Sequence, residues 1–216
     1  RSTIDYKGAK TVNICVVRKI GYSHTEAFRE AAERIEEECR RKEISCTTRS
    51  KEDKLADLNI IIGSHLEPSK ILQFDKSKCL IINLERLQAL NKIKENECYI
   101  KILTTFQYID FSSANTDYCE RENIPQPLYL YRPWFEEKWK RVINEIEKTW
   151  DVCLIGSMTP RRQAIIEQLE QAGLSVTSRF DCYSYERDEV LSKSKICINI
   201  HAYEGNKTAE IWRLNY

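Results

Sequence analysis

The sequence predicts an α/β protein in which each of two domains is built on a parallel β-sheet. Short apolar runs alternate with segments of helical periodicity along the chain, which is the strand-then-helix order of such folds. The runs are apolar almost throughout, as expected of strands that are buried on both faces. The same order starts again at Asp151, which indicates a second sheet.

In the first half, the strand signals lie at 11–17, 44–49, 58–65 and 79–85, with a fifth element inside 99–112. The clearest helix signal follows the first strand, over 23–43. Ser23 and Glu26 have the S-x-x-E spacing of a capping box, and basic residues gather at the far end, where the helix dipole favours them.

The second series has strand signals after a Trp-rich segment that we expect to be a linker helix. Three parts are therefore expected: a first domain over 1–133, a linker helix over 134–150, and a second domain over 151–216. The expected strands of the second domain are 152–155, 175–180 and 195–200. Since only three strands are laid down, we expect this domain to be incomplete in the present chain.

Composition narrows the function classes. The chain has 216 residues, 42% of them hydrophobic and 31% charged, which is typical of a soluble globular protein. A formal net charge of +1, without interleaved aromatic and basic residues, argues against nucleic-acid binding. No run has the apolar length of a membrane span and no secretory leader is evident, so we expect a cytoplasmic protein.

The nine cysteines are an odd number and form no C-x-x-C pair. Four of them lie in apolar strand-like runs: Cys15, Cys79, Cys153 and Cys197. Buried free thiols in a reducing compartment fit this pattern better than disulfides or a zinc site.

An unusual pair of cations stands at the start of a predicted helix. Gly156 and Ser157 follow a strand signal, Pro160 opens the helix, and Arg161 and Arg162 occupy its first turn. The helix dipole disfavours cations there by roughly 0.3–1 kcal/mol. A bound phosphate would reverse that preference, because free N–H groups and guanidinium groups both bind its oxygens. Alternatively, both arginines point to solvent or pair with Glu167 or Glu204.

Further candidates lie where parallel strands end, the usual place of ligand sites in open α/β sheets. In the first half these are His24, His65 and Glu85, and in the second half His201, Tyr203 and Glu204. Glu210 and Arg213 stand three residues apart and could hold a ribose, or could form a surface ion pair. His24 could be a base or merely solvated, and His201 a ligand or a structural histidine.

At these residues the chain resembles the bacterial-type GT-B glycosyltransferases, whose members carry a "GAHLL" strand end, a "YNTEQL"-like segment and a late "NLHYYE…E…R" block. The resemblance covers nearly the whole chain and is most specific in the second half. The stretches that carry it are "VVRKIGYSHTEAFREA", "NIIIGSHLE", "IINLERL", "YIDFSSANTDYCERENI", "VCLIGSMTPRRQAIIEQLEQAGLSV", "ERDEVLSKSKICINIHAYE" and "EIWRLNY".

The resemblance implies two Rossmann-like domains that face a cleft, a sugar nucleotide on the second and a hydroxyl acceptor on the first. It implies transfer without a metal or other cofactor, the diphosphate being stabilised by the helix end and arginines. The implied donor-side residues are Gly156, Ser157, Arg161, Arg162, His201, Tyr203, Glu204, Glu210 and Arg213.

On the acceptor side the resemblance implies His24 and Glu85, either of which could take the acceptor proton, with His24 preferred. The chain departs from the family where Arg86 replaces a common glutamine, and where it stops after "RLNY". The alternative function is a GT-B-like domain without turnover that binds a nucleotide or a protein. The alternatives left open are the sugar, the base, the acceptor, the stereochemistry and the oligomeric state, with a homo-oligomer as one alternative.

Overall fold

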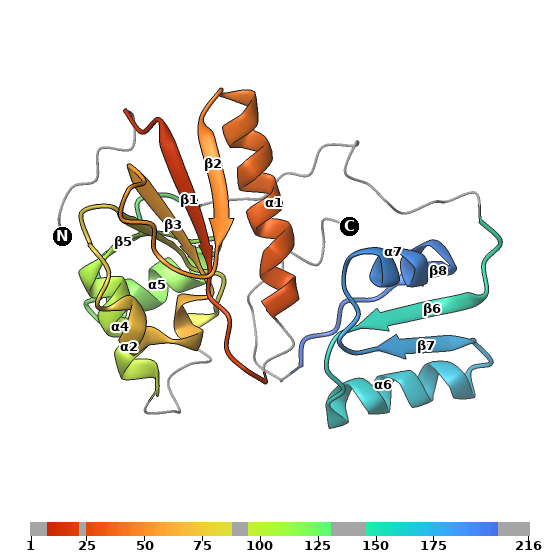
Figure 1. The fold of residues 1–216 in the computed structure, drawn as a ribbon. Coiled ribbons are helices and arrows are strands. Elements are labelled where there is room, and N and C mark those ends of the chain that lie inside the picture. The colour runs from red at the N-terminus through yellow and green to blue at the C-terminus, as the bar shows by residue number, and fades with distance from the viewer. Residues whose placement is uncertain (1–7, 22–24, 88–94, 131–145, 203–216) are drawn as a thin grey trace. The chain divides into compact units, whose positions relative to one another are not determined.

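A computed structural model of the chain describes residues 8–21, 25–87, 95–130 and 146–202 (Figure 1). The chain divides into two compact units, residues 1–132 and 133–216. Each unit is an α/β structure on its own parallel sheet, as the alternation of strand and helix signals predicts.

The sheet of the first unit has five parallel strands in the order β2-β1-β3-β4-β5. Their bounds are Thr11–Val16 (β1), Ser45–Arg49 (β2), Leu58–Ile62 (β3), Cys79–Ile82 (β4) and Gln107–Ile109 (β5). One register row runs across four strands through Cys15, Ile61, Ile81 and Tyr108, each with no exposed surface. This row forms part of the core.

Helices cover both faces of this sheet. Helix α1 (Glu26–Arg41) lies on one side, and α2 (Pro68–Ile71), α4 (Glu95–Thr105) and α5 (Ser113–Arg121) lie on the other (Figure 1). A short 3-10 turn, η2 (Ser64–Leu66), precedes α2. This distribution follows from right-handed crossovers, because the chain steps outward in one direction from β1 to β2 and in the other from β3 to β5.

Helix α1 begins later than the capping-box spacing predicts. Its N-cap is Thr25, whose side chain makes no capping hydrogen bond, and Ser23 lies outside the described residues. The rest of the helix agrees with its pattern. Phe28, Ala31 and Cys39 are buried against the sheet, and Arg40 and Arg41 stand in the last turn.

The second unit has three parallel strands in the order β7-β6-β8. They are β6 (Trp150–Ile155), β7 (Val176–Arg179) and β8 (Ser194–Cys197), joined by α6 (Pro160–Gln171) and α7 (Ser184–Ser192) on opposite faces (Figure 1). Its small core contains Cys153, Cys182, Val190 and Leu191.

Two expectations for this unit are wrong. The helix expected over 134–150 does not extend through its last residues: 131–145 lie outside the description, and 146–149 are not helical. The main-chain N–H groups of Thr149 and Trp150 donate instead to the carbonyl of Lys193, which brings the chain into the sheet. Cys197, expected to be buried, is exposed because β8 forms an edge of the sheet, whereas Cys15, Cys79 and Cys153 are buried. All nine cysteines are free thiols.

Each sheet reverses its strand order once. In the first sheet the reversal lies between β1 and β3, and in the second between β6 and β8. In doubly wound sheets, ligands bind at such reversals, beyond the carboxyl ends of the strands, because the connecting loops leave toward opposite faces there. Among the described residues, no helix is long and apolar enough to cross a membrane.

Gly63 shapes the turn that follows β3. Its φ is +78°, and an added Cβ would lie 3.0 Å from the ring of Phe28. Gly21 has the same φ, but a Cβ there would meet nothing within 4 Å. We expect Gly21→Ala to lower the free energy of unfolding by about 1–2 kcal/mol, the cost of a left-handed backbone alone. Gly63→Ala should cost more, because it adds the collision with Phe28.

Urea denaturation of the two variants and the wild type measures the difference. Equal losses would contradict a tight contact between Gly63 and Phe28.

Candidate functional site

A histidine and a carboxylate meet at the carboxyl edge of the first sheet. His65 follows β3 and Glu85 follows β4, and the imidazole Nε2 lies 3.4 Å from Glu85 Oε1. Both are partly shielded, with 16% of the His65 side chain and 31% of the Glu85 side chain exposed. The structure therefore brings together two of the strand-end residues that the sequence singles out.

The imidazole ring of His65 packs against two aromatic rings. Phe28 of α1 and Tyr99 of α4 make T-shaped contacts with it, at centroid distances of 5.8 and 5.9 Å. Burial lowers the pKa of His65 from its usual 6.5; the charge of Lys19 also lowers it, and the charge of Glu85 acts in the opposite direction. The ring is therefore neutral at neutral pH.

The main chain around Glu85 is fixed by two buried asparagines. The Oδ1 of Asn83 accepts from the Glu85 N–H at 2.9 Å, and its Nδ2 donates to the Glu85 carbonyl at 3.0 Å. Asn115 of α5 donates to the same carbonyl at 2.8 Å and accepts from the N–H of Leu87. The hydroxyl of Tyr99 donates to Asn83 Oδ1 at 2.6 Å.

Both asparagines are anchored on Asp110, which directly follows β5. Its carboxylate accepts from Asn83 at 2.7 Å, from Asn115 at 2.9 and 3.2 Å, and from the main-chain N–H groups of Phe111 and Ser112. Burial raises the pKa of Asp110, and these hydrogen bonds to the charged form act against that rise. A buried carboxylate thus organises the loops after β4 and β5.

The sequence analysis did not identify Asn83, Asp110 and Asn115. Asn83 and Asp110 each follow an apolar run, in "IIN" and "YID", which is the feature that singled out Glu85, whereas Asn115 lies within α5 and carries no such signal. His24, the preferred base, lies outside the described residues. Its role stays a prediction.

In the second unit, the loop after β6 leads directly into α6. Gly156 adopts φ +140°, in the region that favours glycine, and its N–H donates to the carbonyl of Arg179 at 2.8 Å. Thr159 caps the helix by accepting from the N–H of Arg162 at 3.4 Å, and Pro160 takes the first helical position. The loop thus presents the amino end of a helix at the strand-order reversal.

The two arginines at this helix start differ sharply. Arg161 is exposed, whereas Arg162 is 1% exposed. The guanidinium of Arg162 donates to the Ser157 carbonyl at 2.6 Å and to the Ile200 carbonyl at 2.9 Å from Nε and 2.6 Å from Nη2. Arg162 therefore joins the loop after β6 to the segment after β8. The alternative that both arginines point to solvent is wrong for Arg162.

His201 directly follows Ile200, so the Arg162 contacts hold its main chain beside the loop after β6. Tyr203, Glu204, Glu210 and Arg213 lie outside the described residues, and their predicted roles are not addressed. Within the described ranges, no group of three or more His, Cys, Asp or Glu side chains is arranged to hold a metal ion.

We expect His65 to make the first unit sensitive to acid. Because the folded-state pKa lies below 6.5, the unfolded chain binds the proton first as the pH falls. The contribution of His65 to stability is complete above 6.5 and is lost as the pH falls through 6.5 toward the folded-state pKa. Chemical denaturation at a series of pH values measures this loss.

His65→Asn should flatten this pH dependence, and Glu85→Gln should extend the loss to lower pH, because the Glu85 charge raises the pKa of His65. An unchanged pH profile in His65→Asn would rule out this origin.

We expect Arg162→Met to destabilise the second unit by about 2–4 kcal/mol, because two carbonyls lose charge-assisted donors and a buried side chain changes. Arg161→Met is the matched control on the neighbouring, exposed residue and should change stability by less than about 0.5 kcal/mol. Thermal unfolding monitored by circular dichroism measures both. Equal effects would show that the Arg162 contacts contribute little.

Comparison with known proteins gives relatives without a described activity. No protein-family model matches the chain. The chain is similar to "Uncharacterized protein L140" of Acanthamoeba polyphaga mimivirus, with 29% identity over 67% of this chain and 47% of that protein. It is also similar to "Uncharacterized protein R358" of the same virus, with 26% identity over 69% of this chain and 50% of that protein. The chain thus spans about half the length of these two relatives.

Proposed function

We propose that the chain is part of a glycosyltransferase that moves a sugar from a nucleoside-diphosphate sugar to a hydroxyl acceptor. The observation that carries the proposal is the loop after β6, which presents the amino end of α6, with Arg161 exposed beside it, at a strand-order reversal. A positive helix end and an exposed guanidinium together suit a diphosphate. The ordered resemblance to GT-B glycosyltransferases supports the same function.

In this proposal the second unit stabilises the departing diphosphate. The bond between the anomeric carbon and the diphosphate oxygen breaks, and negative charge grows on that oxygen. Arg161 and the positive end of the α6 dipole stabilise this charge. Arg162 acts as a positioning residue, because its guanidinium already donates to the Ser157 and Ile200 carbonyls.

In the first unit, Glu85 takes the proton of the acceptor hydroxyl while the oxygen attacks the anomeric carbon. His65 positions the Glu85 carboxylate through the 3.4 Å contact. The asparagines and Asp110 fix the main chain on either side of Glu85. A carboxylate with 31% of its side chain exposed remains accessible to an acceptor.

A second candidate is a GT-B-like module that binds a nucleotide or a protein without turnover. The hydrogen bonds of Arg162 favour this second candidate. A nucleotide-sugar site that relied on both arginines would need both guanidinium groups to contact the ligand, but the Arg162 guanidinium already contacts main-chain carbonyls. The two candidates differ in whether a bound nucleotide sugar is consumed.

Calorimetry of the 216-residue chain with UDP, GDP, CDP, ADP and their common sugar conjugates tests the donor site. We expect one diphosphate to bind, and Arg161→Ala to weaken it about tenfold, because one charge-assisted contact is lost. Lys195→Ala is the control, since Lys195 pairs with Asp151 near the amino ends of β8 and β6, whereas Arg161 follows the carboxyl end of β6.

Absence of binding by a folded sample, or equal losses in the two variants, would refute the donor site. Binding without hydrolysis or transfer would favour the non-catalytic module. If transfer occurs, Glu85→Gln should reduce it while leaving diphosphate affinity unchanged.

A further inference from the structure

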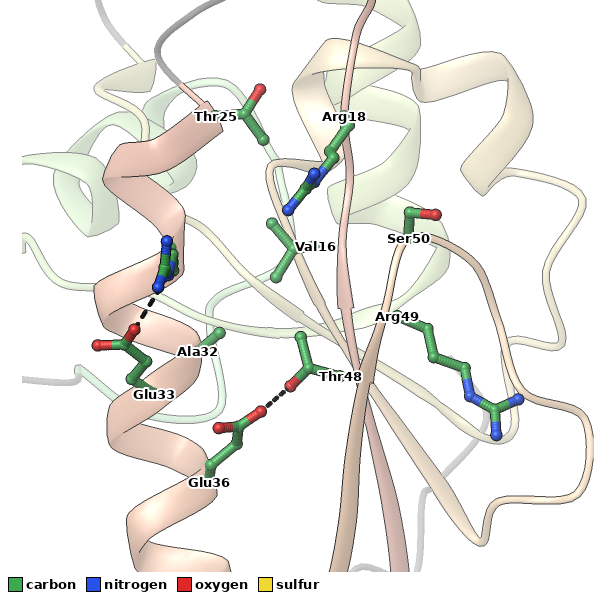
Figure 2. A pocket seen from close by; sticks show the side chains of 10 residues that line it. Val16, Arg18, Thr25, Ala32, Glu33, Glu36, Thr48, Arg49 and Ser50 are labelled. Atoms are coloured by element: carbon green, nitrogen blue, oxygen red, sulfur yellow. Dashed lines mark hydrogen bonds and ion pairs between the residues drawn. The ribbon is translucent and has the colours of Figure 1, made fainter. Parts of the chain in front are cut away.

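A cavity of about 360 Å³ opens at the carboxyl ends of β1 and β2, against the first turns of α1 (Figure 2). Val16 and Ala32 form its apolar wall, and Thr25 and Thr48 add hydroxyl groups. Its volume is near the lower end of the range for small-molecule sites, so it suits a ligand of about monosaccharide size and is small for a whole nucleotide sugar.

Two charged side chains that line the cavity have no ionic partner among the described residues. Arg18 follows β1 and extends between β1 and α1, and Glu36 reaches from α1 toward β2, where it accepts a hydrogen bond from the Thr48 hydroxyl (Figure 2). The structure shows no ion pair for either side chain within the ranges it describes. A cation and a carboxylate are thus both available at one cavity.

The other arginines of the lining are engaged. Arg29 pairs with Glu33 at 3.1 Å, and Arg49 pairs with Asp53 at 3.0 Å. The Arg49 side chain leaves β2 on the side away from α1 (Figure 2). It therefore serves as an internal comparison for Arg18, being the same residue type at the rim of the same cavity.

The chemistry of the lining specifies a ligand with two kinds of groups. A guanidinium without an ionic partner binds phosphate or carboxylate oxygens. A carboxylate that already accepts from a hydroxyl, beside two threonines, binds hydroxyl donors. A polyhydroxy compound that carries one anionic group satisfies both, whereas a neutral sugar leaves Arg18 without a partner.

We propose that this cavity binds a monosaccharide that carries a phosphate or a carboxylate, with the anionic group on Arg18 and hydroxyl groups on Glu36. Resting on the proposed function, this compound is the acceptor, or the acceptor's terminal unit. The first turns of α1 connect the cavity to the His65–Glu85 pair. Thr25 and Arg29 line the cavity, and Phe28 contacts the ring of His65.

Ligand-observed NMR with the 216-residue chain and no nucleotide tests the cavity. The probes are glucose 6-phosphate, glucuronate, glucose, glycine and inorganic phosphate. We expect one of the two anionic sugars to bind at least about tenfold more tightly than glucose, because the charge-assisted contact is worth that factor. The stronger of the two identifies the anionic group.

Arg18→Gln should remove this preference, and Arg49→Gln should leave it unchanged. Glu36→Gln should weaken the anionic sugar without changing the affinity for inorganic phosphate. Circular dichroism confirms that each variant is folded; if Arg18→Gln is not, the Glu36→Gln comparison decides.

Four results would overturn the proposal: no binding of either anionic sugar, equal losses in Arg18→Gln and Arg49→Gln, inorganic phosphate as tight as the sugar phosphate, or tighter binding of glycine. The nucleotide experiment on Arg161 is separate. Anionic sugar binding without any nucleotide binding would refute glycosyl transfer and leave the cavity assignment intact, and the reverse result would refute the cavity alone.

Discussion

The carboxyl edge of the first sheet depends on the buried carboxylate of Asp110. Where parallel strands end, their main-chain groups leave the sheet and need other partners, and burial makes an unmade hydrogen bond costly. Asp110 provides acceptors for the main-chain N–H groups of Phe111 and Ser112 and for the amides of Asn83 and Asn115. Those amides in turn fix both main-chain groups of Glu85, so a buried carboxylate sets the main-chain position of a partly exposed one.

In the second unit, a buried cation rather than a buried carboxylate satisfies main-chain groups beyond the ends of the strands. Arg162 is a buried donor that satisfies the carbonyls of Ser157 and Ile200, which follow β6 and β8. In each unit, one buried ionisable side chain thus fixes loops at the carboxyl ends of the strands, and a more exposed charged side chain lies next to the groups that it fixes. In the first unit this side chain is Glu85, with 31% of its side-chain surface exposed, and in the second it is Arg161. In the proposed function, the buried group fixes the loops and the more exposed group contacts the ligand.

Much of the fold could be predicted from the sequence, because strands that are buried on both faces must be apolar over their whole length. All eight strands overlap the predicted segments. Helices α2, α5 and α7 were not predicted separately: α2 has only four residues, and the mixed composition of α7, "SYERDEVLS", carries little amphipathic periodicity. The exposure of Cys197 depends on which strand forms the edge of the sheet, and strand order is not written in the local sequence.

The candidate site was less accessible to sequence reasoning for a physical reason. Asn83 and Asp110 are 27 residues apart along the chain, and Arg162 reaches a carbonyl 38 residues away. The sequence shows that Arg162 is charged. It does not show that its guanidinium donates to main-chain carbonyls rather than to solvent or a ligand. Strand-end polarity identified His65 and Glu85, yet only the register of β3 and β4 brings them to 3.4 Å.

The contacts of Arg162 have a consequence for divergence among related chains. The guanidinium holds the carbonyls of Ser157 and Ile200, and every residue type offers a carbonyl at those positions. Side chains in these two segments can therefore change without breaking the hydrogen bonds by which Arg162 joins the loop after β6 to the segment after β8. A ligand pocket lined by such segments can change its ligand preference one substitution at a time. Replacing the arginine itself would instead remove the hydrogen bonds that join the two segments.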